Sequence, residues 1–318
     1  MKPLKHPQAE MMRKSLSNKI KAAKKIRKNF VINAKQFSGS PLTISEWFGR
    51  LGNNIQQVCL GILYAQKNNL RFISPKHELI NSISYQYNGI YCLLPKLTNR
   101  FFSFTDSEAV PDTDLTYQHI KDHIYEIAQR YIYPNLLVPK LEPLGQDCLV
   151  IHLRGGDVFN KNVVIHKAYV QNPLSYYLEL IKRFKKTIVV AEPGSFNPIL
   201  DKLVQIPSVL IQSGSLEDDF STLLRAKNLA SSGVGTFAIA AALCSKNLEQ
   251  FFYSDCYLTE NLNPEWLPKK INKICIPLPN YIEIGHWSNS DENQELLLTY
   301  QLQGFADINQ SSPTPMAK

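Results

Sequence analysis

Cys148-Leu149-Val150-Ile151-His152-Leu153 is the stretch that decides the fold, and it runs directly into Arg154-Gly155-Gly156-Asp157. Six residues of almost continuous apolar character are typical of a strand buried on both faces of a parallel sheet. The paired glycines predict a turn at its carboxyl end. Downstream the alternation continues, with strands expected over 187–191, 209–212, 229–231 and 251–253 and helices over 173–186, 197–204, 215–226 and 236–245. This pattern predicts an α/β domain with a parallel sheet.

Upstream, residues 41–73 follow the pattern of one βαβ unit. A short strand over 41–45 precedes the glycine-punctuated turn Gly49-Arg-Leu-Gly-Asn-Asn54, which leads into a helix over 55–66 and a strand over 70–73. A further helix is expected from Asp114 to about Tyr131. Prolines at 134, 139 and 143 indicate an interdomain linker. We therefore expect two α/β domains, 37–145 and 146–285, with a basic segment before them, 1–36, and an extension after them, 286–318.

The composition excludes several classes of protein. The chain has 318 residues, of which 44% are hydrophobic and 19% charged, so it can bury a large core and is neither disordered nor fibrous. It contains no apolar run of the roughly 20 residues that cross a membrane, and no apolar stretch of a signal peptide follows its basic start. Six cysteines without a CxxC pair argue against a zinc site and favour reduced thiols in a cytoplasmic protein.

The net charge of +8 comes from one segment. Residues 1–36 hold eleven of the 35 lysines and arginines and one of the 27 acids, so the remaining residues carry 24 bases against 26 acids. A basic face that spans the globular body, as nucleic acid would require, is therefore not expected. Residues 12–30 have apolar positions at helical spacing with lysines opposite, which favours either a helix lying on anionic membrane or one packed on the body.

Ligands of open α/β sheets bind at loops that leave the carboxyl ends of the strands, which draws attention to the loop after residue 153. Arg154 offers a planar fork of donors that suits phosphate oxygens, and the two glycines allow close approach to the backbone. Asp157 could hold Arg154 in position or accept a hydrogen bond from a ligand hydroxyl. The alternative is an ion pair at a strand end.

Three further segments could meet a nucleotide. Ser231-Ser-Gly-Val-Gly-Thr236 and Gly49-Arg-Leu-Gly-Asn-Asn54 each precede a helix, where backbone N–H groups attract anions. Neither matches the phosphate loop of P-loop proteins or the dinucleotide fingerprint, and ordinary capping or a simple glycine turn would explain each one alone. Asp218 and Asp219 open a helix, where a carboxylate could accept from guanine or could simply interact with the helix dipole.

Together these segments resemble the fucosyltransferase superfamily that includes the α1,2-, α1,6- and protein-O-fucosyltransferases. Gly49-Arg-Leu-Gly-Asn53 looks like its first-domain G-[GR]-x-G-N loop, and His152-Leu-Arg154 with Asp157 looks like its H-x-R-x-x-D signature. Ser231-Ser232 before a helix looks like its phosphate loop, and Asp219 stands where the family places a carboxylate against guanine. The resemblance covers about residues 46–245.

The resemblance implies a GT-B fold, in which two Rossmann-like domains face each other across a cleft, and an inverting transferase that needs no metal or other cofactor. Arg154 would contact the β-phosphate of a GDP-sugar and stabilise the charge on the leaving GDP. Asn53 would meet the same diphosphate from the first domain, and His152 and Asp219 would hold the guanosine. The implied donor-binding residues are Gly52, Asn53, His152, Arg154, Asp219, Ser231, Ser232 and Thr236, with Arg154 and Asp157 as catalytic residues.

The sequence also departs from that family. Gly155 stands where a second arginine is common, and the loop after Asp157 has no carboxylate where the α1,6 branch places its general base. Asp157 and His166 remain as candidates for the base. Gly233-Val-Gly235 replaces residues that are commonly aromatic or serine. These differences leave the linkage, the branch and the sugar open.

Two other patterns could suggest a metal. Asp112-Thr-Asp114 has the DxD form of metal-dependent glycosyltransferases, but it follows Pro111 and precedes an expected helix, which favours helix capping. His119 and His123 are spaced like a ligand pair on a helix, yet the glutamate of an HExxH motif is missing, so a solvated helix face is expected. No metal site is therefore predicted.

The function expected from the sequence is transfer of fucose from GDP-fucose to a glycan or glycolipid hydroxyl in surface polysaccharide synthesis. The protein would be cytoplasmic, with residues 12–30 as a peripheral contact at the inner face of the membrane. One alternative is a transferase of the same fold that uses another nucleotide sugar. The other is an adaptor that binds membrane or nucleic acid through residues 1–36.

Overall fold

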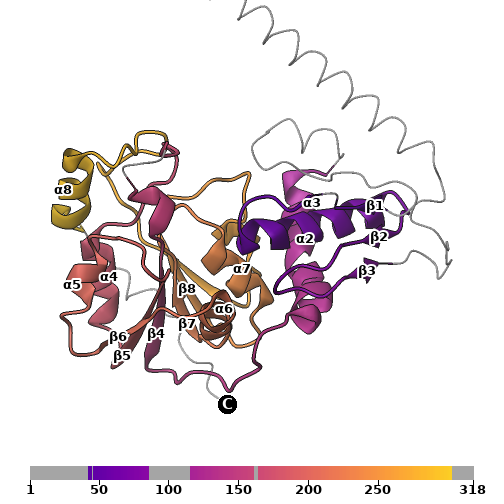
Figure 1. Cartoon of the computed structure of the whole chain (residues 1–318), viewed down its shortest axis with the longest axis horizontal. Coiled ribbons are helices and arrows are strands. Elements are labelled where there is room, and N and C mark those ends of the chain that lie inside the picture. The colour runs from indigo at the N-terminus through magenta and orange to yellow at the C-terminus, as the bar shows by residue number, and fades with distance from the viewer. Residues whose placement is uncertain (1–41, 45, 86–114, 161–163, 303–318) are drawn as a thin grey trace, which may run out of the picture.

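The computed structural model describes residues 42–44, 46–85, 115–160 and 164–302, which are drawn in colour in Figure 1. The basic helix expected over 12–30 and the triplet Asp112–Asp114 lie outside the described residues. Among the helices that are described, none combines the length and the apolar character needed to cross a membrane.

The larger part of the structure is a six-stranded sheet in which every pair of neighbouring strands is parallel (Figure 1). Its strands lie in the order β6-β5-β4-β7-β8-β9. The chain leaves the central strand β4 toward β5 and β6 and then returns to the opposite side of β4 with β7. This order makes the sheet Rossmann-like and creates a topological switch point between β4 and β7. The strands are β4 (Cys148–Leu153), β5 (Lys186–Ala191), β6 (Val209–Gln212), β7 (Asn228–Ala230), β8 (Gln250–Tyr253) and β9 (Asn272–Cys275).

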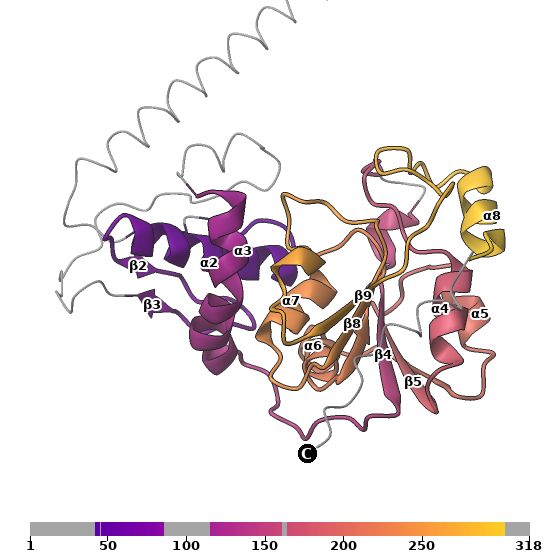
Figure 2. The same cartoon turned by 180° about the vertical axis from the view of Figure 1, so that it is seen from behind.

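Helices cover both faces of this sheet (Figure 2), and for this reason every residue of β4 except His152 is apolar. Alternate residues of β4 enter different cores: Leu149 and Ile151 pack with α4, α5 and α8, whereas Val150 packs with α6 and α7. The helices are α4 (Leu174–Ile181), α5 (Leu200–Leu203), α6 (Leu216–Leu224), α7 (Phe237–Cys244) and α8 (Asp291–Thr299).

The N-terminal part contains the expected βαβ unit. Strands β1 (Leu42–Thr43) and β2 (Phe72–Ile73) are parallel and are joined by helix α2 (Leu51–Lys67), while β3 (Ser84–Tyr85) pairs antiparallel with β2. Helix α3 (Tyr117–Ile127) continues as a π-helical turn and a short 3₁₀ turn to Asn135.

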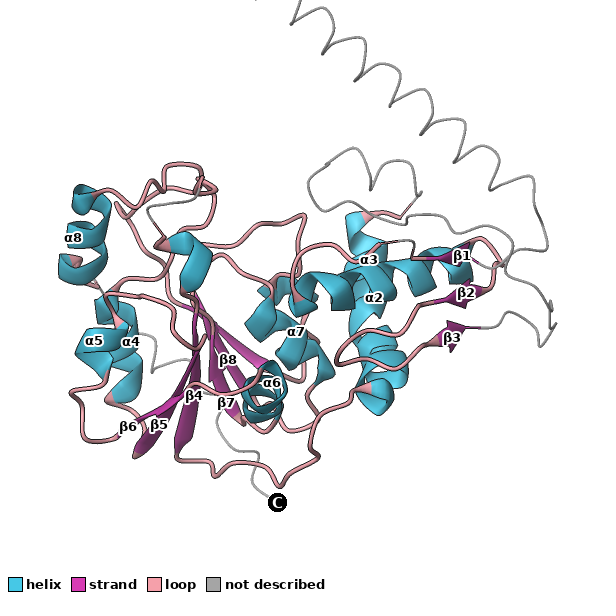
Figure 3. Cartoon of the chain, in the orientation of Figure 1, coloured by secondary structure: helices cyan, strands magenta, loops and turns pink. Residues whose placement is uncertain are grey.

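One apolar core joins the two parts of the chain. It runs from Ile55 and Ile62 of α2 through Ile124 of α3 to Ile239 and Leu243 of α7, all of which are buried. Figure 3 shows α2 and α3 beside α7, with the six-stranded sheet on the far side of α7. Because α2 packs on α7, the N-terminal loop that begins α2 is brought to the edge of the larger sheet.

Several boundaries differ from the sequence-based expectation. Helix α4 ends at Ile181 rather than near 186, because β5 already begins at Lys186 and a turn must separate them. Helix α3 begins at Tyr117 rather than 114, since the Thr116 side chain accepts a hydrogen bond from the N–H of His119 and caps the helix there. Strand β9 and helix α8 were not expected.

The proline-marked connection lies along α6. Ser221 donates a hydrogen bond to the carbonyl of Pro139, and the Arg225 side chain donates to the carbonyl of Glu142. The backbone N–H of Leu144 in turn donates to the Arg225 carbonyl. The connection is therefore held along the helix by three polar contacts before it enters β4.

Candidate functional site

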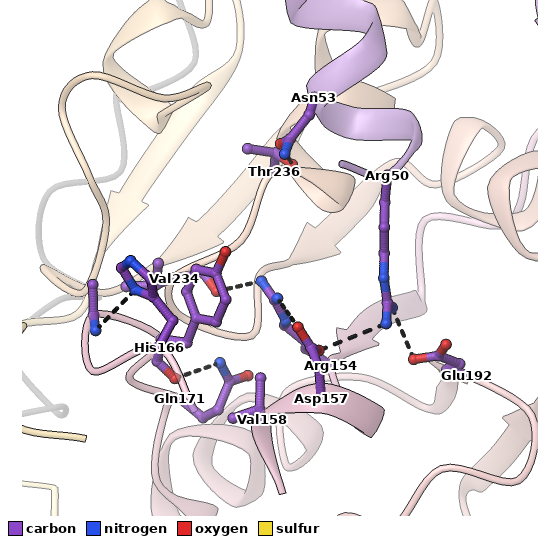
Figure 4. A network of polar contacts seen from close by, with 12 residues as sticks. Arg50, Asn53, Arg154, Asp157, Val158, His166, Gln171, Glu192, Val234 and Thr236 are labelled. Carbon is purple, nitrogen blue, oxygen red and sulfur yellow. Dashed lines mark hydrogen bonds and ion pairs between the residues drawn. The ribbon is translucent and has the colours of Figure 1, made fainter. Parts of the chain in front are cut away.

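Three loops that leave the carboxyl ends of β4, β5 and β7 meet the start of α2 at the switch point of the sheet (Figure 4). Parallel strands end at a common edge, so Arg154 and Asp157 after β4 lie beside Glu192 after β5 and Thr236 after β7. The structure thus brings the segments 49–54, 154–157 and 231–236 together at this edge. Residues 51–54 form the first turn of α2, and so the expected start of that helix at residue 55 was wrong.

Arg154 is the central cation of this site. Its side chain is 16% exposed, and its Nη2 donates a 2.9 Å hydrogen bond to Oδ2 of Asp157. Its Nη1 makes a longer hydrogen bond, 3.5 Å, to the carbonyl of Val234, and its Cζ lies 4.1 Å from the centre of the Tyr169 ring. The guanidinium is thus fixed at two edges and on one face. Such a fork, held in place before a ligand arrives, suits a phosphate or carboxylate.

Asp157 lies between two guanidinium groups that come from distant parts of the sequence. Its Oδ1 is 3.6 Å from Nη2 of Arg50, the residue that precedes α2, and this shielded oxygen accepts no hydrogen bond from the described residues. Arg50 also donates a 2.9 Å hydrogen bond through Nη1 to Glu192. The two arginines and two acids form one chain of charges, Glu192–Arg50–Asp157–Arg154, drawn with dashed lines in Figure 4.

Gly156 leaves the space in which Arg50 and Glu192 contact each other. It has a φ of +62°, and a Cβ atom there would lie 2.7 Å from a carboxylate oxygen of Glu192 and 3.7 Å from Nη2 of Arg50. Both the left-handed backbone and the missing side chain are therefore needed at this position.

Asn53 and Gly52 join α2 to the start of α7. The hydroxyl of Thr236 donates a 2.7 Å hydrogen bond to the side-chain oxygen of Asn53. A Cβ on Gly52 would lie 2.5 Å from the Thr236 hydroxyl oxygen and 2.7 Å from its backbone carbon. The N-termini of α2 and α7 therefore approach the same region, where the dipoles of both helices attract anions.

His152, the penultimate residue of β4, lies under the site. Its Nδ1 is 3.4 Å from the hydroxyl of Ser232, and its ring is 5.1 Å from that of Phe237. Burial, together with the positive charges of Arg154 and Arg50, lowers the pKa of His152 to about 3. The imidazole is consequently neutral at physiological pH and can donate or accept one hydrogen bond at each nitrogen according to its tautomer.

Two predicted site residues make contacts elsewhere. Asp219 on α6 is buried, and its Oδ1 accepts hydrogen bonds from the N–H of Gly214 and the side chain of Gln212. Burial raises the pKa of Asp219, and these two hydrogen bonds partly offset that effect. Ser231 is buried, and its backbone carbonyl accepts from Asn172. No contact among the described residues links either side chain to Arg154.

The remaining polar candidates are also placed. His166 is exposed, and its ring stacks 4.7 Å from Tyr169, on the segment that borders Arg154. His119 and His123 lie 4.4 Å apart between ring centres, and His123 Nδ1 contacts the His119 carbonyl within one turn of α3. In the described ranges, no three His, Cys, Asp or Glu side chains are grouped so that they could hold a metal ion. The five cysteines in these ranges are free thiols.

Comparison of the chain with protein-family models, with curated proteins and with solved structures finds no match.

Sequence reasoning missed three residues of this site. Arg50 lay inside a quoted motif but had no role assigned, although an arginine beside a glycine loop is a visible signal. Glu192 directly follows β5, and its position one strand from β4 could have indicated it. Tyr169 carries no local signal, because its contact with Arg154 depends on how residues 166–172 fold back over the sheet edge.

Proposed function

We propose that this protein is an inverting, metal-independent glycosyltransferase that moves fucose from GDP-fucose to a glycan hydroxyl. The observation that carries the proposal is Arg154, fixed at the switch point of a Rossmann-like sheet between the loops at 50–53 and 231–236. A GT-B arrangement is part of the proposal, with the N-terminal unit around α2 facing the nucleotide-binding sheet. The shared core between α2 and α7 would keep the two units close.

In the proposed reaction, an acceptor hydroxyl oxygen attacks the anomeric carbon of the sugar while the bond from that carbon to the diphosphate oxygen breaks. Negative charge then develops on the leaving GDP. Arg154 would stabilise this charge in the transition state, as donors aimed at a developing anion do. Asn53, Thr236 and backbone N–H groups at the starts of α2 and α7 would hold the phosphate oxygens before the reaction.

The proton released by the acceptor hydroxyl needs a destination. Asp157 has a guanidinium group near each of its oxygens, so its geometry favours holding Arg154 and Arg50 over accepting that proton. His166 is exposed beside Tyr169 and is the better placed candidate for the base. A transition state with advanced bond breaking would also allow the proton to pass to water.

The donor's nucleoside would lie over the ends of β4, β5 and β6. In the proposal His152 and Ser232 border the ribose or phosphate, and Ser231 supports the loop. Asp219 would accept a hydrogen bond from guanine. Because Oδ1 of Asp219 already binds Gly214 and Gln212, this role would fall to its second oxygen.

The test is a direct comparison of nucleotides. Isothermal titration of the full-length protein with GDP, UDP and CMP should show binding of GDP, and a screen of nucleotide release should give turnover with GDP-fucose above GDP-mannose and UDP-sugars. A preference for UDP would leave a glycosyltransferase with another donor and would remove the role given to Asp219. Absence of binding to all three would overturn the proposal and favour an adaptor acting through residues 1–36.

A further inference from the structure

We propose that Tyr169 is a positioning residue for Arg154: its ring fixes the plane of the guanidinium so that the free donors of Arg154 face the donor phosphate. This inference rests on the proposed function. Tyr169 belongs to none of the motifs quoted from the sequence, and it lies 15 positions beyond Arg154, outside the strand and turn that carry that arginine.

The first support is the geometry at Arg154. Its Cζ lies 4.1 Å from the Tyr169 ring centre, well inside the roughly 6 Å range of a cation–π contact. The hydrogen bonds to Asp157 and Val234 take two of the five N–H donors. Three contacts at two edges and one face define a plane, whereas the two hydrogen bonds alone would allow the fork to tilt about the line between them.

The second support is that Tyr169 is held by the same loop that would bind phosphate. The N–H of Val234 donates a 2.9 Å hydrogen bond to the carbonyl of Val170, and the N–H of Asn172 donates a 3.0 Å bond to the carbonyl of Ser232. Gln171 and Gly233 form an antiparallel bridge between these bonds. Tyr169 and the 231–236 loop are therefore one unit, so ligand contacts on the loop are coupled to the ring over Arg154.

The third support is a set of hydrogen bonds from residues 281–287 to the segments that carry Tyr169 and Asp157. Tyr281 donates from its hydroxyl to the carbonyl of Gln171, 3.0 Å away, and the N–H of Trp287 donates to the carbonyl of Lys167, also at 3.0 Å. The buried indole of Trp287 donates to the carbonyl of Val158, which follows Asp157. Residues 281–287 thus hold both the segment that carries Tyr169 and the loop that carries Asp157.

This arrangement makes a specific chemical prediction. A prealigned guanidinium needs no reorientation when charge develops on the leaving phosphate, so loss of the aromatic ring should slow the chemical step more than it weakens ground-state binding. Loss of the hydroxyl alone should matter little, since the contact is made by the ring face.

The experiment uses full-length protein with GDP-fucose turnover, GDP titration and thermal unfolding as readouts. Tyr169→Phe should keep turnover within about twofold, whereas Tyr169→Leu should lower kcat by about tenfold, the size expected for a desolvated cation–π contact. The Kd for GDP should rise by less than the fall in kcat. Tyr169→Met, which keeps apolar bulk without the ring, should behave like Tyr169→Leu and serves if the leucine variant does not fold.

Two controls separate positioning from a general loss of structure. Tyr133→Leu removes a ring whose centre lies 4.4 Å from Nζ of Lys246, beyond the C-terminal end of α7, whereas the site lies at its N-terminal end. This variant should leave kcat unchanged. In the double variant Arg154→Ala/Tyr169→Leu, the loss should not exceed that of Arg154→Ala alone, because the ring acts through the guanidinium.

The outcomes are distinguishable. Wild-type turnover in Tyr169→Leu, or a loss in the double variant equal to the product of the two single losses, would overturn the positioning role while the proposed function stands. A wild-type protein that binds no nucleotide would overturn the proposed function and this inference with it.

Discussion

The Thr236 hydroxyl donates a 2.7 Å hydrogen bond to the Asn53 side-chain oxygen, although the two residues are 183 positions apart. This bond joins the first turn of α2 to the residue that precedes α7. Through this bond, the glycine-containing segments 49–54 and 231–236, each a weak signal in the sequence alone, lie side by side at the candidate site.

The bond between Asn53 and Thr236 should contribute measurable coupling to stability. We expect Asn53→Ala and Thr236→Val to be non-additive, with an interaction free energy of about 0.5–1.5 kcal/mol, because each removes the partner of the other. Urea unfolding of the wild type, both single variants and the double variant measures it. Strict additivity would mean that the contact contributes nothing to joining the helices.

Gly52→Ala should destabilise the fold. Its Cβ would lie 2.5 Å from the Thr236 hydroxyl oxygen and within 2.8 Å of backbone atoms of Thr236, which cannot move without shifting α7. Overpacking of this kind costs about 1–3 kcal/mol in the free energy of unfolding. Gly235→Ala is the matched control, since the nearest atom to its Cβ would be 3.6 Å away. Equal urea midpoints for the two variants would contradict the close approach of α2 to α7.

Arg154→Ala should reduce turnover with GDP-fucose by about 10²–10³-fold, as loss of a donor to a developing anion does. Arg154→Lys should recover only part of this, because an ammonium keeps the charge but lacks the planar fork and cannot stack on Tyr169 in the same way. Steady-state kinetics with nucleotide release measures both. Unchanged turnover in the alanine variant would remove Arg154 from the mechanism.

The low pKa of His152, about 3 in the folded protein against an ordinary value of 6.5, predicts a pH dependence of stability. Between these values the unfolded chain binds a proton that the folded protein does not, so the free energy of unfolding falls as the pH falls from about 6.5 toward 3. His152→Asn removes this contribution. As the pH falls from 7 to 5, the free energy of unfolding of the wild type should therefore decrease by about 2 kcal/mol more than that of the variant.

Urea unfolding at these two pH values checks the prediction, with His286→Asn as the control because that side chain is 72% exposed. If the His152 variant and the wild type lost stability in parallel, the imidazole would have to titrate normally in the folded state.

Residues 1–36 should bind anionic lipid without affecting nucleotide binding. In the full-length protein, replacing Lys21, Lys24, Lys25 and Lys28 with glutamine removes four charges, each worth about 1 kcal/mol near an anionic surface. We expect the affinity for phosphatidylserine vesicles, measured by sedimentation, to fall by roughly 10²–10³-fold. The Kd for GDP, measured by titration, should stay unchanged. Vesicle binding equal to wild type would show that another surface contacts the membrane.

Much of the larger sheet could be read from local pattern. The strand at 209–212 has the predicted limits, and the strand predicted over 148–153 is the observed β4. The helix expected over 215–226 is α6, and the Ser215 side chain caps it by accepting a hydrogen bond from the N–H of Asp218. By contrast, β9 was missed because Asn272-Lys-Ile-Cys275 lies at the sheet edge, where one polar face weakens the apolar signal.

Four residues of the candidate site could be identified as candidates from short local patterns. Arg154 and Asp157 follow an expected strand, and Asn53 and Thr236 lie beside expected helix starts. A strand buried on both faces is almost continuously apolar, and a tight turn favours glycine. Both features can therefore be recognised from consecutive residues.

The tertiary structure alone decided which of these residues meet. The strand order that places β7 beside β4, the Arg50 contact with Glu192 across 142 positions, and the ring of Tyr169 over Arg154 each depend on pairings between distant segments. Such pairings are selected by the packing of whole helices on a sheet, in particular α2 on α7, and by the hydrogen bonds from Tyr281 and Trp287. No local run of residues encodes them, because the energy that selects them comes from the assembled core.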